Sequence, residues 1–188
     1  MYPLFETLCI ENGKIQNIDL HQARYERSLR EYYGKSAVKI FNLFSLIQLP
    51  APLQNQLVRC RIDYNAKTTQ IQYFEYHRKI YRTFQPVICD DIKYGLKYSD
   101  RSLINKLFDQ RGSCDEIIII KNGKVTDCSI GNLIFRQGEK WYTPDTPLLL
   151  GTQREKLLQE GKIQERTIFQ EDIVNFDEIK IINAMNSL

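Results

Sequence analysis

The chain has 188 residues, of which 43% are hydrophobic and 26% charged, a composition typical of a globular protein and unlike that of disordered or fibrous chains. Its formal net charge of +3 is small and spread along the chain, whereas a nucleic-acid-binding protein usually carries a concentrated basic stripe. No apolar run approaches the ~20 residues that span a bilayer, and residues 1–6 lack the basic and apolar regions of an export signal. We therefore expect a cytoplasmic protein that binds neither nucleic acid nor membrane.

The cysteines and histidines do not form a metal-binding pattern. No C-x-x-C pair occurs, and the five cysteines and two histidines lack the spacing of a zinc site. We expect reduced, mostly buried thiols and no bound metal. The cysteines are Cys9, Cys60, Cys89, Cys114 and Cys128.

The first half of the chain is predicted to form hairpins and two helices. Asn12 and Gly13 mark a tight turn between two strands, because both residues tolerate positive φ. Asp19 is the predicted N-cap of the first helix, which ends at Gly34, and Ser36 is the predicted cap of the second. The predicted strands cover 4–10, 14–18, 57–63 and 69–76, and the helices cover 20–33 and 36–47.

The second half is richer in strands. Asn122-Gly123 and Gly138 mark hairpin turns, and Gly161 ends a helix. Because most strands follow one another through hairpins, the pattern indicates an α+β fold of two small domains, residues 1–84 and 85–188. The predicted strands cover 86–89, 116–120, 124–127, 132–135, 140–143 and 178–182, and the helices cover 99–110 and 152–160.

Five motifs occur in an order that is informative as a set. LFETL and HQARYERS lie near the start, KYSDR follows, then DEIIIIKNGKVTDCSIGNLIF, and finally WYTPDTPLLLGTQREKLL. Together they resemble the class IV aminotransferases, the branched-chain aminotransferase-like family of pyridoxal-phosphate enzymes of fold type IV, over nearly the whole chain. The resemblance implies the D-amino acid aminotransferase-like fold, with two small α/β-type domains and the cofactor in the cleft between them.

The cofactor implied by the resemblance is pyridoxal 5′-phosphate (PLP), an electron sink that the protein must anchor and tune. Lys97 matches the lysine that carries the cofactor and moves protons. Lys93 is the nearby competitor, but only Lys97 has the following Ser-Asp-Arg in the family's register. Asp127 stands where the family usually places a glutamate that keeps a proton on the pyridine nitrogen. The alternative for Asp127 is a turn-capping residue at a strand end.

The phosphate of PLP requires N–H groups and a cation. Gly151 and Thr152 open a predicted helix, whose N-terminus binds anions through free N–H groups and the helix dipole. The resemblance assigns Arg24 as the phosphate-binding arginine and places Asn183 in a second phosphate-contacting loop. The alternatives are a surface arginine on the first helix and a turn residue at the end of a strand.

Substrate contacts are assigned to the first half of the chain. Glu6 in LFETL resembles a residue on the substrate side of the family's site. Arg59 and Arg61 alternate on one strand face, and a guanidinium binds a substrate carboxylate bidentately. We assign Arg61, although a solvated face is the alternative for both arginines. The expected substrate is therefore a small amino-acid-like molecule with a carboxylate.

The resemblance leaves two main reactions open. Branched-chain transaminases usually carry Asn-Tyr at the fourth and fifth positions after the lysine, whereas this chain has Arg101 and Ser102. That arginine and the late INAM motif resemble 4-amino-4-deoxychorismate lyases, which release pyruvate to give p-aminobenzoate for folate biosynthesis. We favour the lyase. A branched-chain or D-amino acid transaminase and a non-catalytic scaffold that retains the fold are the alternatives.

The resemblance also implies a homodimer in which the neighbour's first domain completes each active site. The family's usual D-R-G-x-x-Y-G-D-G turn does not precede the LFETL motif in this sequence. Help from a partner subunit in forming the substrate pocket is therefore expected.

Overall fold

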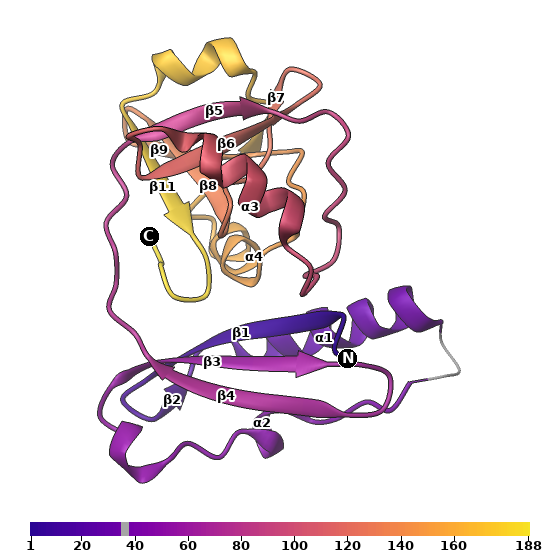
Figure 1. The fold of residues 1–188 in the computed structure, drawn as a ribbon. Helices are drawn as coiled ribbons and strands as arrows, with labels where there is room; N and C mark the ends of the chain where they lie inside the picture. The colour runs from indigo at the N-terminus through magenta and orange to yellow at the C-terminus, as the bar shows by residue number, and fades with distance from the viewer. Residues whose placement is uncertain (35–37) are drawn as a thin grey trace. The chain divides into compact units, whose positions relative to one another are not determined.

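A computed structural model describes residues 1–34 and 38–188 of the protein (Figure 1). The chain forms two compact units. The first contains residues 1–78 and 96–100, and the second contains residues 79–95 and 101–188. The mixture of helices and antiparallel strands confirms the α+β class predicted from the sequence.

Residues 96–100 belong to the first unit, although the sequence division at 84/85 places them in the second domain. The reason is backbone pairing beside the first strand. Phe5 N donates to the Lys97 carbonyl at 3.0 Å, and Ser99 N donates to the Pro3 carbonyl at 2.8 Å. The backbone around Lys97 is thereby fixed along strand β1 by hydrogen bonds.

The first unit is a four-stranded antiparallel sheet, in the order β2-β1-β3-β4, with helix α1 packed on it. Its largest buried side chains include Tyr25 of α1 and Tyr64 of β3, whose rings meet edge to face at 4.8 Å. Its elements are β1 (Leu4–Glu11), β2 (Lys14–Ile15), α1 (Ile18–Tyr33), α2 (Leu43–Leu46), the 3-10 turn η1 (Ala51–Leu53), β3 (Leu57–Tyr64) and β4 (Thr69–Glu75).

Two local predictions in the first unit are corrected by the structure. Helix α1 begins two residues earlier than expected, at Ile18, with Asn17 rather than Asp19 as its N-cap. Of the helix predicted over 36–47, the described residues 38–47 are helical at Leu43–Leu46 alone, and the predicted cap Ser36 lies outside the described residues. Residues 38–42, just before α2, are not helical, and N–H groups there bond elsewhere, for example that of Phe41 to the Tyr25 hydroxyl at 3.3 Å.

The second unit contains two sheets, in the orders β5-β6-β7 and β10-β9-β8-β11. The β5–β6 and β9–β10 pairs are parallel, which the hairpin pattern of the sequence did not predict. Its elements are β5 (Phe84–Ile88), α3 (Ser102–Phe108), the 3-10 turn η2 (Asp109–Arg111), β6 (Glu116–Lys121), β7 (Lys124–Val125), β8 (Asn132–Gln137), β9 (Lys140–Pro144), α4 (Thr152–Gln159), β10 (Gln164–Arg166), the 3-10 turn η3 (Gln170–Asn175) and β11 (Glu178–Ile182).

The apolar run of β6 is explained by burial on both of its faces. Successive side chains of a strand point to opposite faces. Ile117 and Ile119 join the core beneath α3, and Ile118 and Ile120 join a second core with Phe135 of β8. The predicted turns are confirmed as well, since Asn12, Gly13, Asn122 and Gly123 all have positive φ.

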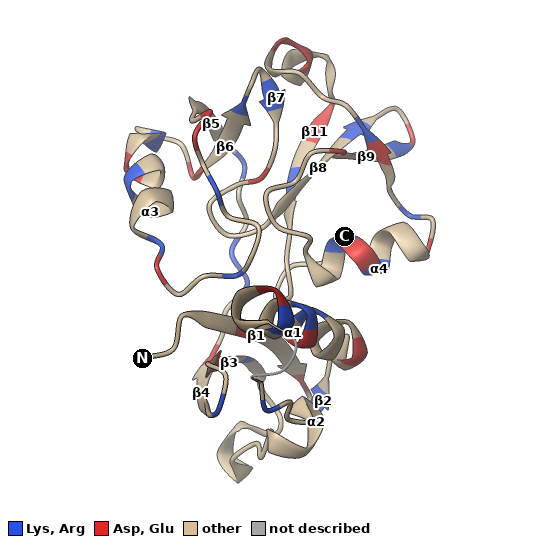
Figure 2. Ribbon diagram, turned by 90° about the vertical axis from the view of Figure 1, so that its right-hand side faces the viewer, with Lys and Arg blue, Asp and Glu red and all other residues tan. Residues whose placement is uncertain are grey.

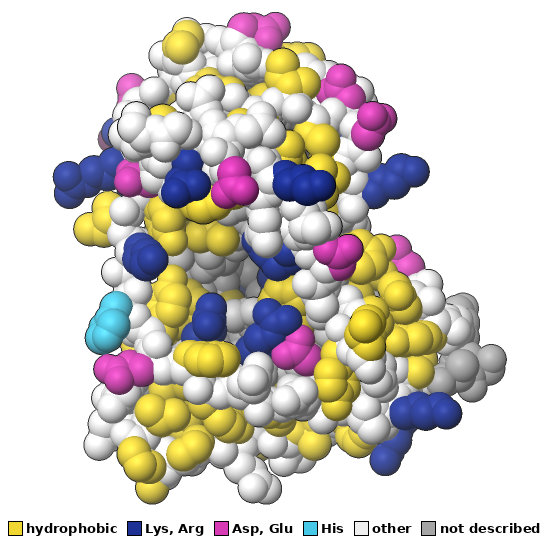
Figure 3. All heavy atoms as spheres, viewed as in Figure 1, with side chains coloured by type: hydrophobic (Ala, Val, Ile, Leu, Met, Phe, Trp, Pro, Cys, Tyr) yellow, Lys and Arg dark blue, Asp and Glu magenta, His cyan; other side chains and the backbone are white. Residues whose placement is uncertain are grey.

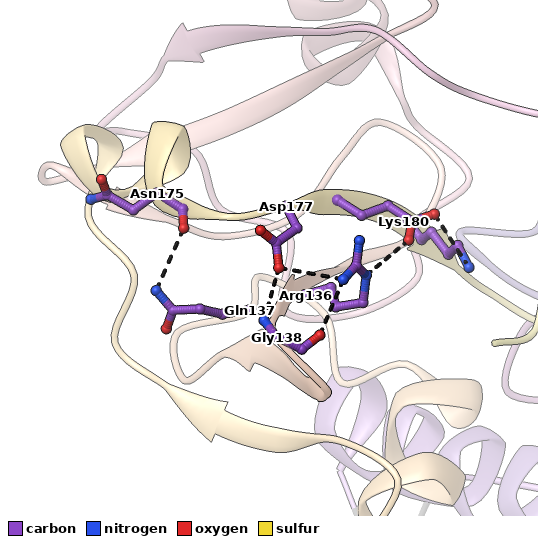
Figure 4. A network of polar contacts seen from close by, with 7 residues as sticks. Arg136, Gln137, Gly138, Asn175, Asp177 and Lys180 are labelled. Carbon is purple, nitrogen blue, oxygen red and sulfur yellow. Dashed lines mark hydrogen bonds and ion pairs between the residues drawn. The ribbon is translucent and has the colours of Figure 1, made fainter.

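A polar network fixes the turn between β8 and β9 to β11 (Figure 4). Arg136 donates to Glu178 at 3.2 Å, to Asp177 at 3.3 Å and to the Gly138 carbonyl at 3.1 Å. Gly138 N in turn donates to Asp177 at 2.8 Å. Gln137 donates to the Asn175 carbonyl at 3.5 Å. The network is largely exposed, so it contributes to the register of the hairpin more than to its stability.

Charged residues of both signs are distributed over the elements of each unit (Figure 2). On the face drawn in Figure 3, basic and acidic side chains alternate with apolar and polar ones. Within residues 1–34 and 38–188, no helix is both long enough and apolar enough to cross a membrane. No group of His, Cys, Asp or Glu able to hold a metal ion occurs in the same residues.

Replacing Phe135 and its neighbour Arg136 separately should distinguish the core from the surface network. Phe135 is fully buried, so Phe135→Ala should lower the free energy of unfolding by about 3–5 kcal/mol. Arg136→Ala removes exposed ion pairs and should lower it by about 1 kcal/mol or less. Urea unfolding followed by circular dichroism measures both. Equal losses would show that the exposed network, rather than the core, holds the second unit together.

Candidate functional site

Asp127 lies between β7 and β8 in the second unit, and only 5% of it is exposed. One carboxylate oxygen accepts hydrogen bonds from Leu148 N and Leu149 N at 3.0 Å each, and the other accepts from Asn132 Nδ2 at 2.7 Å. Burial raises the pKa of Asp127 to about 6. The hydrogen bonds from Leu149, Asn132 and Leu148, and the more distant charge of Arg154, offset this only in part. The site thus holds a desolvated carboxylate whose hydrogen-bond donors are neutral.

Asn132 links Asp127 to the start of helix α4. Its side-chain amide donates to Asp127 and also to the Leu149 carbonyl at 2.9 Å. A Cβ atom at Gly151 would lie 2.0 Å from Asn132 Oδ1, so only glycine fits at that position. Gly151 is the N-cap of α4, and Thr152, the next residue, is buried. The first N–H groups of this helix lack intrahelical acceptors, which is the property that a phosphate site uses.

Asn183 lies just beyond β11 and touches the loop that carries Asp127. Its side-chain oxygen accepts from Met185 N at 2.9 Å and Asn186 N at 3.0 Å, and its amide donates to the Ile130 carbonyl at 3.3 Å. The structure therefore brings together four of the predicted site residues in the second unit. They are Asp127, Gly151, Thr152 and Asn183.

The other predicted residues gather in the first unit. Glu6 is fully buried in β1, and Arg24 of α1 donates to both of its oxygens, at 2.8 and 2.6 Å. His21 Nδ1 lies 2.8 Å from Glu6 Oε2. Burial would raise the pKa of Glu6, but Arg24 and His21 outweigh it and lower that pKa to about 2. The observed contacts of Glu6 orient Arg24, and a contact between Glu6 and substrate stays a prediction.

Lys97 and Arg61 meet at one aromatic ring. The Lys97 ammonium lies 4.7 Å, and the Arg61 guanidinium 3.9 Å, from the centroid of the Phe5 ring. Arg61 also pairs bidentately with Asp63, at 2.7 and 2.6 Å. Arg59 of β3 instead lies over Phe74 of the edge strand β4. Of the two candidate arginines, Arg61 is therefore the one that shares its surroundings with Lys97.

One buried network was not predicted from the sequence. Glu116, 1% exposed at the start of β6, accepts from the Ser129 hydroxyl at 2.8 Å and from Ser129 N at 3.3 Å. Arg101 donates to the Ser129 carbonyl at 2.6 Å. Burial raises the pKa of Glu116. The available signal was an acidic residue opening an otherwise apolar strand, since a charge in such a strand is buried only with partners.

Comparison with solved structures first defines the class of protein. An aminotransferase of Mycobacterium tuberculosis described as hypothetical, solved with PLP bound, matches with a TM-score of 0.82 over 99% of this chain and 78% of that one. At 14% identity this match shows the fold alone. This chain therefore shares the fold of that aminotransferase.

More specific matches then define the family. The model of the amino-transferase class IV family matches residues 92–188. The crystal structure of a candidate 4-amino-4-deoxychorismate lyase from Haemophilus somnus 129PT is 54% identical over 100% of this chain and 98% of that one, with a TM-score of 0.96. An uncharacterized protein of Haemophilus influenzae strain Rd is 93% identical over the full length of both chains. This chain belongs to the class IV aminotransferase family, whose members are PLP-dependent enzymes.

Replacing Glu6 measures how much the ion pair with the buried Arg24 contributes to the free energy of unfolding. Glu6→Gln leaves that charge uncompensated and should destabilise the protein by about 3–5 kcal/mol. Because the pKa of Glu6 is lowered from 4.5 to about 2, its contribution is complete above pH 4.5 and is lost as the pH falls towards 2. Urea unfolding between pH 2 and 7 should show this loss in the wild type and not in the variant.

The matched control is Glu26→Gln, which removes an exposed pair between Glu26 and Arg30 on the same helix as Arg24. Its expected cost is about 0.5 kcal/mol or less. An equal cost for the two variants would mean that the buried charge of Arg24 is stabilised by other groups.

Proposed function

We propose that the chain is a PLP-dependent 4-amino-4-deoxychorismate lyase, which releases pyruvate from its substrate and yields p-aminobenzoate. The observation that carries the choice of reaction is Arg101, which replaces the Asn of the Asn-Tyr pair usual after the lysine of branched-chain transaminases. Its guanidinium bonds to the Ser129 carbonyl, in the loop that follows Asp127. The 54% identity to the Haemophilus somnus protein, itself described as a candidate lyase, supports the same choice.

The residues present fit PLP. A buried carboxylate with neutral hydrogen-bond donors is costly to ionise, and a protonated pyridine nitrogen would offset that cost. Asp127 is such a group, and it contacts, through Asn132, the N-terminus of a helix suited to a phosphate. When bound, the cofactor supplies an electron sink for the bond changes at the substrate's amino-bearing carbon.

Each residue then has a separate role in the proposed enzyme. Lys97 carries the cofactor and moves a proton, and Asp127 keeps a proton on the ring nitrogen. The N-terminus of α4 at Gly151 and Thr152, together with Arg24 and Asn183, binds the phosphate. Arg61, oriented by Asp63 and Phe5, binds a substrate carboxylate. Glu6 holds Arg24 in place. We also propose a cytoplasmic homodimer, with the cofactor between the two domains.

The proposed reaction is tested with the purified protein, PLP and 4-amino-4-deoxychorismate. Pyruvate and p-aminobenzoate should form in equal amounts, without an added 2-oxo acid. A parallel assay with branched-chain or D-amino acids and 2-oxoglutarate tests the transaminase alternative. Glutamate formation there, with no pyruvate released in the first assay, would assign the chain as a transaminase instead. A chain that binds PLP in neither case would favour the scaffold alternative.

The assignment of Lys97 is tested by borohydride reduction, which fixes PLP permanently to the lysine that carries it. Wild-type protein should give one modified peptide containing Lys97, and Lys97→Ala should give none. The thermal midpoint of Lys97→Ala should stay close to that of the wild type, because Lys97 is only partly buried. Lys93→Ala is the matched control and should be modified normally. A modified peptide at Lys93, or none in the wild type, would refute the assignment.

Asp127→Asn tests the charge opposite the ring nitrogen. Losing one partner of a buried charge pair typically costs about 2–5 kcal/mol, so turnover of Asp127→Asn should fall roughly thirty-fold or more. Asp127→Glu restores the family's usual residue and should be tolerated better. Below about pH 6 the wild-type carboxyl is protonated, so the difference in PLP affinity between wild type and Asp127→Asn should shrink as the pH falls through that value. Taking the ratio of affinities cancels the titration of the cofactor's own phosphate.

The amide of Asp127→Asn can accept from Leu148 and Leu149 but faces the Asn132 amide with a second donor. Thermal unfolding without cofactor measures that structural cost separately. Asp127 would be a structural turn residue if Asp127→Asn bound PLP and reacted like the wild type while Asp127→Glu was inactive.

A further inference from the structure

We propose that Asn132 is a positioning residue that fixes the Asp127 carboxylate relative to the first turn of α4. This inference rests on the proposed function in one respect, namely that PLP is the ligand whose ring nitrogen and phosphate these two groups bind. The single side chain of Asn132 would then set the spacing between the groups that receive the two ends of the cofactor.

The side-chain amide of Asn132 donates hydrogen bonds both to Asp127 and to the segment before α4. Asn132 is 3% exposed, so each of its polar atoms requires a partner within the protein. Its amide nitrogen donates to Asp127 Oδ1 at 2.7 Å and to the Leu149 carbonyl at 2.9 Å. Leu149 N in turn donates to the other oxygen of Asp127 at 3.0 Å. Asp127, Asn132 and the segment leading into α4 therefore form a closed ring of contacts, in which no member can move alone.

The contact with Gly151 is steric and independent of those hydrogen bonds. A Cβ atom at Gly151 would lie 2.0 Å from Asn132 Oδ1, which is far inside contact distance, and 3.8 Å from the Cβ of Arg154, which is ordinary contact. The N-cap of α4 thus packs directly on the Asn132 amide. A larger residue at position 151 would displace Asn132 and, through it, the Asp127 carboxylate.

The backbone around Asn132 has little freedom to absorb such a displacement. Asp127 and Asn132 form an isolated bridge, and Cys128 N donates to the Gly131 carbonyl at 3.0 Å, which closes the loop between them. A Cβ atom at Gly131 would lie 2.6 Å from the Ile182 carbonyl at the end of β11. Because the loop is held on both sides, its backbone would not absorb a displacement of the Asn132 side chain, which would be passed to Asp127.

Two substitutions at position 132 separate the donor from the steric contact. Asn132→Asp keeps the shape and the close approach to Gly151 but replaces the donor to Asp127 with a second carboxyl group. Asn132→Ala removes both. Gly151→Ala introduces the Cβ clash, and Gly95→Ala is its matched control, because a Cβ atom at Gly95 meets no atom within 4 Å and its φ is not positive.

The first experiment is a double-mutant cycle measured by thermal unfolding without cofactor. Gly151→Ala should lower the unfolding midpoint strongly in the wild-type and Asn132→Asp backgrounds and only slightly in the Asn132→Ala background. Gly95→Ala should have the same small effect in all three. Equal effects of Gly151→Ala in every background would overturn the steric half of the inference.

The second experiment measures the pKa of Asp127 in the cofactor-free protein by NMR of its ¹³C-labelled carboxyl. Loss of the Asn132 donor should raise that pKa above the wild-type value in Asn132→Ala, since a hydrogen bond to the charged form favours it. The pKa of Asp127 in Asn132→Asp does not isolate this effect, because the like charge of the new carboxylate raises it as well. A residue that served only to begin strand β8 would leave the pKa unchanged. An unchanged pKa in Asn132→Ala would therefore overturn the proposed link to Asp127.

The third measurement is PLP binding, followed by the cofactor's absorbance. A hydrogen bond to a charged group is strong enough that both variants at position 132 should bind PLP about ten- to a hundred-fold more weakly and show a shifted absorption band. Variants that bind PLP with the affinity and spectrum of the wild type would overturn the inference while leaving the proposed function intact. A wild-type protein that binds no PLP would overturn the proposed function, and the first two experiments would still decide the placement of Asn132.

Discussion

The desolvated carboxylate of Asp127 is the constraint on which the rest of the second unit depends. A buried carboxylate persists only when hydrogen bonds compensate for the water that it has lost, and here three donors do so. Two of them are backbone N–H groups of the segment before α4, and the third is the Asn132 amide. The position of α4, the need for glycine at 151 and the closed loop after β7 follow from satisfying this one group.

The first unit also contains a buried carboxylate, but a cation rather than neutral donors compensates for its loss of water. Glu6 is as buried as Asp127, but its partners include the cation Arg24, so its pKa falls while that of Asp127 rises. The charge of a carboxylate that already pairs with a cation is compensated, so Glu6 gains little from a further positive charge and instead holds Arg24 in position. A carboxylate held only by neutral donors still gains from a positive charge. Under the proposed function, this contrast is the reason for assigning Asp127 to the protonated ring nitrogen, whereas Glu6 orients Arg24.

Motifs and turns were the parts of the structure that the sequence predicted best. Asn-Gly pairs at 12–13 and 122–123 have the positive φ that only a few residue types tolerate, so their turns could be located by residue type alone. Helix boundaries were predicted less well. The segment before α2 was expected to be helical, yet Phe41 N bonds to the distant Tyr25 hydroxyl, and such a partner is invisible to a local pattern.

The sequence by itself determined the α+β class, the family and the positions that match its motifs, because residue types and their order carry that information directly. Only the tertiary structure decided which of these residues touch. It showed that residues 96–100 pack with the first unit and that Arg24 forms an ion pair with Glu6. It also showed that Asn132 contacts both Asp127 and Gly151. Hydrogen bonds and steric contacts between residues remote in the chain depend on distances in space, and no local pattern in the sequence contains those distances.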